Sequence, residues 1–196
     1  RQARVAAESL NQLSSSSPNS TEAMKEEEIK EAQEMRVTLL KVMTKSASAK
    51  PANTTRSVAE VEVLVSGLAA ITEIPEQISA EAQTIAIDFV LDLLGSVRVQ
   101  TGNATGGSNA TSSQETKHVA LSNTAAETTV RAVSNVFESM KPVEPPGKSN
   151  TAIKNASVNA TAAAEEKVKE RRRKSELAKK MSSIVDTIST MQLIGA

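Results

Sequence analysis

The sequence predicts an all-α protein, a bundle of four or five helices joined by long polar loops. Its 196 residues include two Phe but no Trp and no Tyr, whereas strands favour aromatic and β-branched runs. No strict alternation of apolar and polar residues extends beyond a few positions. Apolar residues instead recur at steps of three and four, the spacing of one face of a helix. These observations together favour helices over a sheet.

Residues 1–56 are predicted to form N-terminal helices and a linker, separate from a helical domain at 57–196. The first helix is expected at residues 1–13. The second begins after Thr21, because a threonine hydroxyl suits the N-cap position. The apolar residues of this second helix recur at helical spacing and are expected to face the core; they are Ala32, Met35, Leu39 and Val42.

The next two helices have clear start signals. Ser57-Val-Ala-Glu60 is a capping box, in which a hydroxyl and a carboxylate satisfy free backbone amides. Pro75 interrupts the helical pattern, and Ser79 can cap the following helix. The core face of the first of these helices is expected to comprise Val58, Val61, Leu64, Val65 and Leu68. The second contains Phe89 and is apolar around nearly its whole circumference, so it should be the most buried element.

The C-terminal part contains two further helices and two polar loops, at residues 98–114 and 141–160. A second capping box, Ser112–Glu115, predicts a helix over residues 116–140. The expected seam of that helix is Val119, Ala126, Val130, Val133, Phe137 and Met140. Because this helix and that of Phe89 carry the only two aromatic rings, we expect them to pack together. A last helix is predicted for residues 161–194, charged in its first half, with the apolar stripe Leu177, Met181, Ile184, Val185, Ile188 and Met191.

The composition excludes several classes of function. The absence of cysteine excludes a disulfide scaffold, a cysteine-ligated zinc site and a thiol nucleophile. Balanced charge, with 23 basic and 23 acidic residues, argues against a nucleic-acid partner. No calcium loop or phosphate-binding loop is present in the sequence, so no cofactor is expected. No apolar window long enough for a membrane span occurs in this segment.

Catalytic chemistry has few candidates in this sequence. His118 is the single histidine, and as a general base it would need an orienting acid and a nucleophile that no motif specifies. The acidic clusters Glu26–Glu28 and Glu165–Glu166 are interpreted as solvated helix faces rather than paired catalytic acids. We therefore predict that the chain is not an enzyme and has neither catalytic residues nor a metal site.

Arg171, Arg172, Arg173 and Lys174 form the one concentrated basic run. Such a run can be a nuclear-import signal, a contact for anionic lipid or a contact for a glycosaminoglycan. The alternative is a solvated helix face stabilised by i,i+4 ion pairs, because acidic residues surround the run at helical spacing. Those acidic residues are Glu165, Glu166, Glu170 and Glu176.

Six Asn-x-Ser/Thr triplets indicate a secretory compartment. They lie at Asn19, Asn53, Asn103, Asn109, Asn155 and Asn159. Each falls in a segment that is predicted as a loop on other grounds, where an extended acceptor can be glycosylated. The alternative is that Asn, Ser and Thr are common in loops and form such triplets without glycans. We expect these residues to carry N-linked glycans.

Two stretches resemble a known family. The first is Val61–Gln83, with the connector Thr72-x-x-Pro75-x-x-Ile78-Ser79-x-Glu81, leading into Ala86–Leu94; the second is Ala132–Ser139, followed by Ile184–Ile194. This order of helices is similar to the membrane-proximal extracellular region of the polycystin-1 and sperm receptor-for-egg-jelly family, where it forms the helical part of the GAIN domain. The resemblance covers residues 57–97, 116–140 and 177–194. The family's self-cleavage site, a His-Leu-Thr-like tripeptide in a β-rich part with Cys and Trp, is absent, so no cleavage residue is carried over.

The resemblance implies a glycosylated receptor at the cell surface or at a cilium or flagellum. In such a receptor this region would support the β-rich cleavage subdomain of the same polypeptide and relay adhesion or force. The implied partners are a polycystin-2-type cation channel subunit or an extracellular ligand. Because the chain begins at Arg1 rather than Met and ends within an apolar pattern, we expect it to be part of a longer polypeptide. The alternative is a cytosolic or nuclear helical scaffold that uses the basic run from Arg171 to Lys174.

Overall fold

The computed structural model describes residues 2–14, 22–49, 56–100, 116–118, 121–141 and 160–194. Six α-helices lie in this part of the chain: α1 (Gln2–Ser14), α2 (Glu22–Ser48), α3 (Val58–Ile71), α4 (Ala80–Ser96), α5 (Asn123–Ser139) and α6 (Ala160–Ile194). A 3₁₀ turn, η1 (Pro75–Gln77), joins α3 to α4. The predicted all-α class is confirmed, whereas the expected count of four or five helices is too low.

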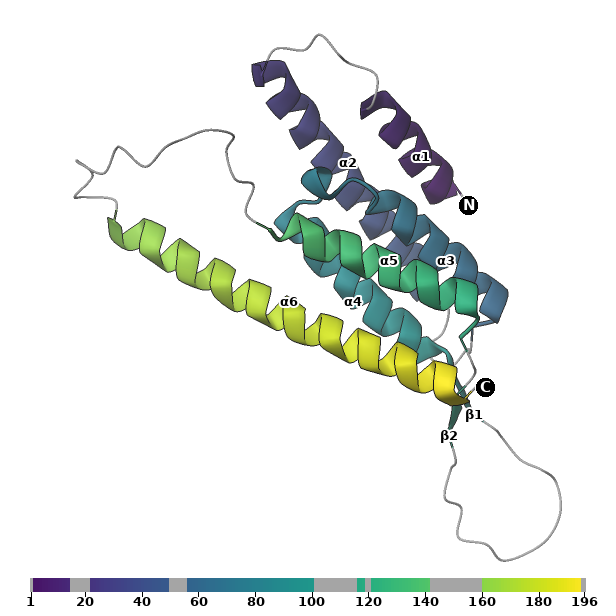
Figure 1. Ribbon diagram of the computed structural model, residues 1–196. Coiled ribbons are helices and arrows are strands. Elements are labelled where there is room, and N and C mark those ends of the chain that lie inside the picture. The colour runs from purple at the N-terminus through teal and green to yellow at the C-terminus, as the bar shows by residue number, and fades with distance from the viewer. Residues whose placement is uncertain are drawn as a thin grey trace, which may run out of the picture.

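The helices lie in two layers of three (Figure 1). In one layer α3 lies between α1 and α5, and in the other α4 lies between α2 and α6. The layers meet where α1 and α3 contact α2 and where α5 contacts α4 and α6. The predicted packing of α4 against α5 is therefore confirmed. This arrangement leaves α3 and α4 as the central helices.

One cluster of buried apolar side chains extends through all six helices. Ala7 of α1 and Leu40 of α2 belong to the same cluster as Val65 of α3 and Ile184 of α6. The core is thus continuous across the boundary predicted at residue 56. Helix α4 contributes eight buried residues, more than any other described helix, which confirms that it is the most buried element.

The predicted helix starts at Ser57 and Ser79 are confirmed. The Glu60 amide donates to Ser57 Oγ over 3.3 Å, and the Ser57 amide donates to Glu60 Oε2 over 3.0 Å, which completes a capping box. Ser79 Oγ accepts from the Ala82 amide over 3.2 Å. Pro75 occupies the first position of η1, where its missing N–H costs no hydrogen bond.

The predicted start of α5 is wrong. The helix begins after Ser122, whose Oγ accepts from the Ala125 amide over 3.1 Å. Residues 116–118 instead form β2 (Thr116–His118), which pairs antiparallel with β1 (Arg98–Gln100). A ladder of three residues is too short to produce an alternating pattern that can be recognised in the sequence. His118 therefore lies on a strand opposite Arg98, and the capping box at Ser112–Glu115 lies outside the described residues.

The buried face of α2 was predicted in part wrongly: Ala32 is buried and Leu39 partly buried as expected, but the other two residues are not. Met35 is 46% exposed and Val42 is 57% exposed. The residues of α2 that are buried are Ala32, Arg36, Val37, Leu40, Met43 and Ala47. This face includes Arg36, and charged residues are almost never fully buried unless they are paired.

The seam of α5 was also predicted in part wrongly, whereas the stripe of α6 is largely confirmed. Phe137 and Val130 are exposed on α5, where most buried residues are small: Ala125, Ala126, Thr129, Ala132, Val133 and Val136. Small side chains allow α5 to approach α3 closely. On α6 the residues Leu177, Met181, Ile184, Ile188 and Met191 are buried as expected, and only Val185 is exposed.

The two phenylalanines provide a matched test of this core. Phe89 is 3% exposed and Phe137 is 51% exposed. Phe89→Ala should lower the free energy of unfolding by about 3–5 kcal/mol, because it leaves a cavity in the core. Phe137→Ala should lower it by less than about 1 kcal/mol. Urea denaturation followed by circular dichroism measures both, and equal losses would contradict this placement of α4 and α5.

Candidate functional site

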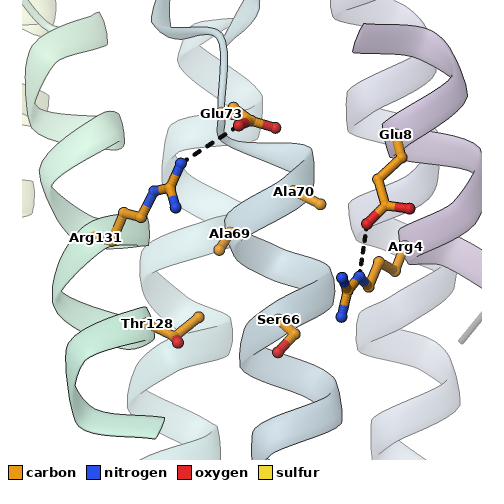
Figure 2. Close-up of a pocket in the computed structure, with 8 residues that line it drawn as sticks. All are labelled: Arg4, Glu8, Ser66, Ala69, Ala70, Glu73, Thr128 and Arg131. Atoms are coloured by element: carbon orange, nitrogen blue, oxygen red, sulfur yellow. Dashed lines mark hydrogen bonds and ion pairs between the residues drawn. The ribbon is translucent and has the colours of Figure 1, made fainter. Parts of the chain in front are cut away.

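A polar groove crosses α3 between α1 and α5 (Figure 2). Its volume is about 230 Å³. Small side chains of α3 form its floor, namely Ser66, Ala69 and Ala70, and Thr128 of α5 lies beside them. The charged residues of the rim are Arg4, Glu8, Glu73 and Arg131. The groove therefore presents both signs of charge around an uncharged floor.

Two ion pairs border the groove on opposite sides (Figure 2). Arg4 Nε lies 2.7 Å from Glu8 Oε1 within α1. Arg131 Nη2 of α5 lies 3.4 Å from Glu73 Oε1, just beyond the end of α3. All four side chains are about half exposed or more, and exposed pairs of this kind contribute little to stability. All four rim charges are thus paired with each other at the surface.

The groove is connected to a buried arginine. Asn11 Nδ2 donates to Glu73 Oε2 over 2.8 Å and to the Ala70 carbonyl over 3.2 Å. Asn11 Oδ1 in turn accepts from Arg36 Nη2 over 2.5 Å. A continuous chain of polar contacts therefore extends from Arg131 on the surface through Glu73 and Asn11 to Arg36 in the core.

Arg36 is fully buried, with 0% of its surface exposed. Its Nε and Nη2 both donate to Gln77 Oε1, over 3.1 and 2.8 Å, and its Nη1 donates to the Ile71 carbonyl. Burial lowers the pKa of the Arg36 guanidinium to about 10, and the nearby Glu73 carboxylate opposes this shift. The side chain therefore remains a cation at neutral pH.

These contacts hold the connector between α3 and α4. The Ile71 carbonyl belongs to the last residue of α3, where helix carbonyls have no partner within the helix. Gln77 closes η1, in which its own amide donates to the Ile74 carbonyl over 3.1 Å. Gln33 of α2 also donates to the Glu76 carbonyl over 3.2 Å. Helix α2 thus fixes the turn that sets the direction of α4 relative to α3.

A second buried polar residue, Gln83, joins α4 to α5 and α6. Its Nε2 donates to Ser139 Oγ over 3.0 Å and to the Ser139 carbonyl over 3.3 Å. Its Oε1 accepts from Arg173 Nη1 over 2.7 Å. Further along α6, Lys180 Nζ lies 2.8 Å from Asp88 Oδ1, and this hydrogen bond raises the pKa of Lys180. Two cations of α6 are therefore bound to α4.

The four residues of the predicted basic run, Arg171 to Lys174, differ in their exposure and in their contacts. Arg173 is half-buried and donates to the Ala80 carbonyl over 3.2 Å as well as to Gln83. Lys174 lies 2.8 Å from Glu170, and that contact lowers the pKa of the Glu170 carboxyl. Arg171 and Arg172 are exposed. The structure thus supports i,i+4 pairing for Lys174 and a structural contact for Arg173, with two exposed arginines beside them.

The remaining candidate residues are dispersed. Glu26–Glu28 and Glu165–Glu166 are exposed, as expected for solvated helix faces. The six asparagines of the Asn-x-Ser/Thr triplets, Asn19, Asn53, Asn103, Asn109, Asn155 and Asn159, lie outside the described residues. Within the described ranges, no three His, Asp or Glu side chains come together in a group that could hold a metal ion. None of the helices in that part of the chain is both long and apolar enough to cross a bilayer.

Comparisons with protein-family models, with curated proteins and with solved structures gave no match. The site is therefore interpreted from its own geometry. That geometry consists of a polar groove, a buried arginine behind it, and a long helix bound by side-chain contacts to α4. Arg36, Asn11 and Gln83 were not among the residues predicted from the sequence. The one signal that could have indicated Arg36 is its position, a lone charge within the apolar segment Met35–Leu40.

The role of the buried Arg36 can be tested by comparison with Arg131, an exposed arginine on the rim of the groove. Arg36→Met should lower the free energy of unfolding by about 3–5 kcal/mol, because the Ile71 carbonyl and Gln77 Oε1 lose a buried charged donor. Arg36→Lys should recover less than half of this loss, since an ammonium group cannot reproduce the planar fork. Arg131→Met should change stability by less than about 0.5 kcal/mol. Thermal unfolding measures all three variants, and an Arg36→Met protein as stable as the parent would contradict the assigned role.

Proposed function

We propose that this chain is a non-catalytic helical module from the extracellular part of a polycystin-1-like membrane receptor. In this proposal it supports a membrane-proximal, β-rich cleavage subdomain of the same polypeptide. It relays adhesion or force toward a polycystin-type cation channel at the cell surface or at a cilium or flagellum. The compartment rests on the six Asn-x-Ser/Thr triplets and the family on the resemblance of the helix order.

The structural observation that carries a support role is the attachment of α6. This helix has 35 residues, which corresponds to a length of about 50 Å at 1.5 Å per residue. Its C-terminal half is packed by five buried apolar residues at steps of three and four, from Leu177 to Met191. Arg173 and Lys180 add polar contacts to α4 along the same side. Its N-terminal half is exposed and charged from Glu165 to Arg172, and extends beyond the other helices (Figure 1).

A helix held in this way is suited to transmit a displacement of its exposed end to the rest of the bundle. Displacement at the exposed end is opposed by contacts spread over several turns rather than by one residue, because each buried side chain touches several others. The contacts with Gln83 and Asp88 lead directly to α4, the most buried helix. This is what a support element between two parts of a receptor requires.

The extracellular part of the proposal is tested by removing N-linked glycans. The full-length protein from its native source should lose mass after treatment with a peptide-N-glycosidase, which hydrolyses the amide bond between asparagine and glycan. Tryptic peptides containing the triplets should then carry aspartate in place of each glycosylated asparagine. A protein of unchanged mass that localises to the cytosol or nucleus would contradict the proposal. That result would favour an intracellular scaffold acting through the exposed Arg171 and Arg172.

The support role makes a separate prediction about the two halves of α6. Amides of residues 177–191 should exchange with solvent at least about tenfold more slowly than those of residues 165–172, because only the former are held by packing. Hydrogen exchange measured by mass spectrometry gives both rates. Ile184→Asp should remove the difference, whereas Val185→Asp, at an exposed position next to it, should preserve it. Equal exchange in both halves of the unmodified protein would contradict the support role.

A further inference from the structure

Helix α2 has a second apolar stripe at the edge of the core, formed by Met35, Leu39 and Val42. Met35 and Val42 are exposed, and Leu39 is partly buried. Together with Ala6 and Leu10 of α1, Met35 and Leu39 line a groove of about 480 Å³. Neither of the two exposed side chains belongs to the core cluster of the described residues. The surface formed by Ala6, Leu10, Met35, Leu39 and Val42 is called the α1–α2 face below.

The stripe has the spacing of a helix–helix seam. Met35, Leu39 and Val42 follow one another at steps of four and three residues, which are the a and d positions of a heptad. Glu31, Thr38 and Lys45 lie at steps of seven along one edge of this seam. In a coiled coil such edge positions carry the charges that select the partner and its direction.

This edge carries two charges of opposite sign, placed at equal distances on either side of Thr38. Glu31 precedes Thr38 by seven residues and Lys45 follows it by seven. Among the described residues, neither charged side chain takes part in an ion pair. The helix dipole does not account for Glu31, because its effect ends within the first turn and α2 begins at Glu22. Glu27, four residues before Glu31, adds like-charge repulsion instead.

We propose that the α1–α2 face is a two-fold interface, at which α2 of a second copy of this chain lies antiparallel to α2. A two-fold axis near Thr38 brings Glu31 opposite Lys45 of the second copy, and the same pair forms again on the other side of the axis. The register that makes these pairs also places Leu39 against Met35 of the second copy. The apolar seam and the charge pattern therefore favour the same alignment of the two α2 helices.

A second copy fits this surface better than a membrane does. A two-fold interface requires a self-complementary patch. If one residue of the first copy contacts a second residue of the other copy, the same two residues also make contact with the copies exchanged. The edge of the α1–α2 face fulfils this condition through Glu31 and Lys45. An anionic lipid surface would be repelled by Glu31 and Glu34, both of which border the groove. The apolar seam from Met35 to Val42 extends for about 10 Å, and the edge from Glu31 to Lys45 for about 20 Å.

Sedimentation equilibrium of the 196-residue chain tests the interface. The unmodified chain should form dimers within a concentration range from ~1 µM to ~1 mM, and raised salt should weaken them. Met35→Glu should raise the dissociation constant at least about tenfold. Because Met35 is exposed, this change should leave the circular dichroism spectrum intact. Val185→Glu on α6 is the matched control, an equally exposed residue on another helix, and should leave the dissociation constant unchanged.

Charge reversal identifies the antiparallel alignment. The E31K and K45E variants should each weaken the dimer, because each places like charges together across the axis. The double variant E31K/K45E should restore dissociation to within about threefold of the unmodified chain. A chain that remains monomeric throughout the concentration range would overturn the proposal. So would a dimer that tolerates Met35→Glu, or one that the double variant fails to restore.

Discussion

The burial of Arg36 is the constraint on which the arrangement of the other helices depends. A guanidinium that leaves water loses strong hydration, and this cost is offset only when several acceptors are held in place around it. Here those acceptors come from three different segments: Asn11 of α1, the end of α3 and Gln77 of η1. Any arrangement that moved one segment away would leave a buried charge with fewer acceptors. Arg36 therefore couples the positions of α1, α2 and α3 to one another.

The connector shows how this coupling affects the second layer of the bundle. Turn η1 determines where α4 begins, and α4 contacts α2, α5 and α6. Gln83, in the first turn of α4, then holds Ser139 of α5 and Arg173 of α6. Two buried polar side chains, Arg36 and Gln83, thus link helices whose other buried contacts are mostly among small and aliphatic residues. Apolar contacts between such residues are not directional, so the polar contacts supply the specificity of the arrangement.

Much of the fold could be predicted from local signals. The starts of α3 and α4 follow from Ser57 and Ser79, and the buried stripe of α6 follows from its heptad spacing. These predictions depend only on residues close together in the sequence. The groove and its anchor could not be predicted in this way, because Asn11, Arg36 and Glu73 come from segments far apart in the chain. Nothing local indicates that an arginine in α2 will meet the carbonyl of Ile71.

The prediction of the buried face of α2 failed in part because Arg36 is buried, and the burial of Arg36 also explains why the α1–α2 face is exposed. The helix carries two overlapping apolar stripes, one through Leu40 and Met43 and the other through Met35, Leu39 and Val42. The first stripe includes the charged residue Arg36, whereas the second includes no charged residue. Folding buries the first, because the acceptors around Arg36 make its burial tolerable and its aliphatic stem adds apolar contact. An arginine that has acceptors in the core thus leaves a well-patterned apolar stripe on the surface. Since apolar spacing and opposed charges at Glu31 and Lys45 occur together on that stripe, its pattern is better explained by a partner helix than by the core of this chain.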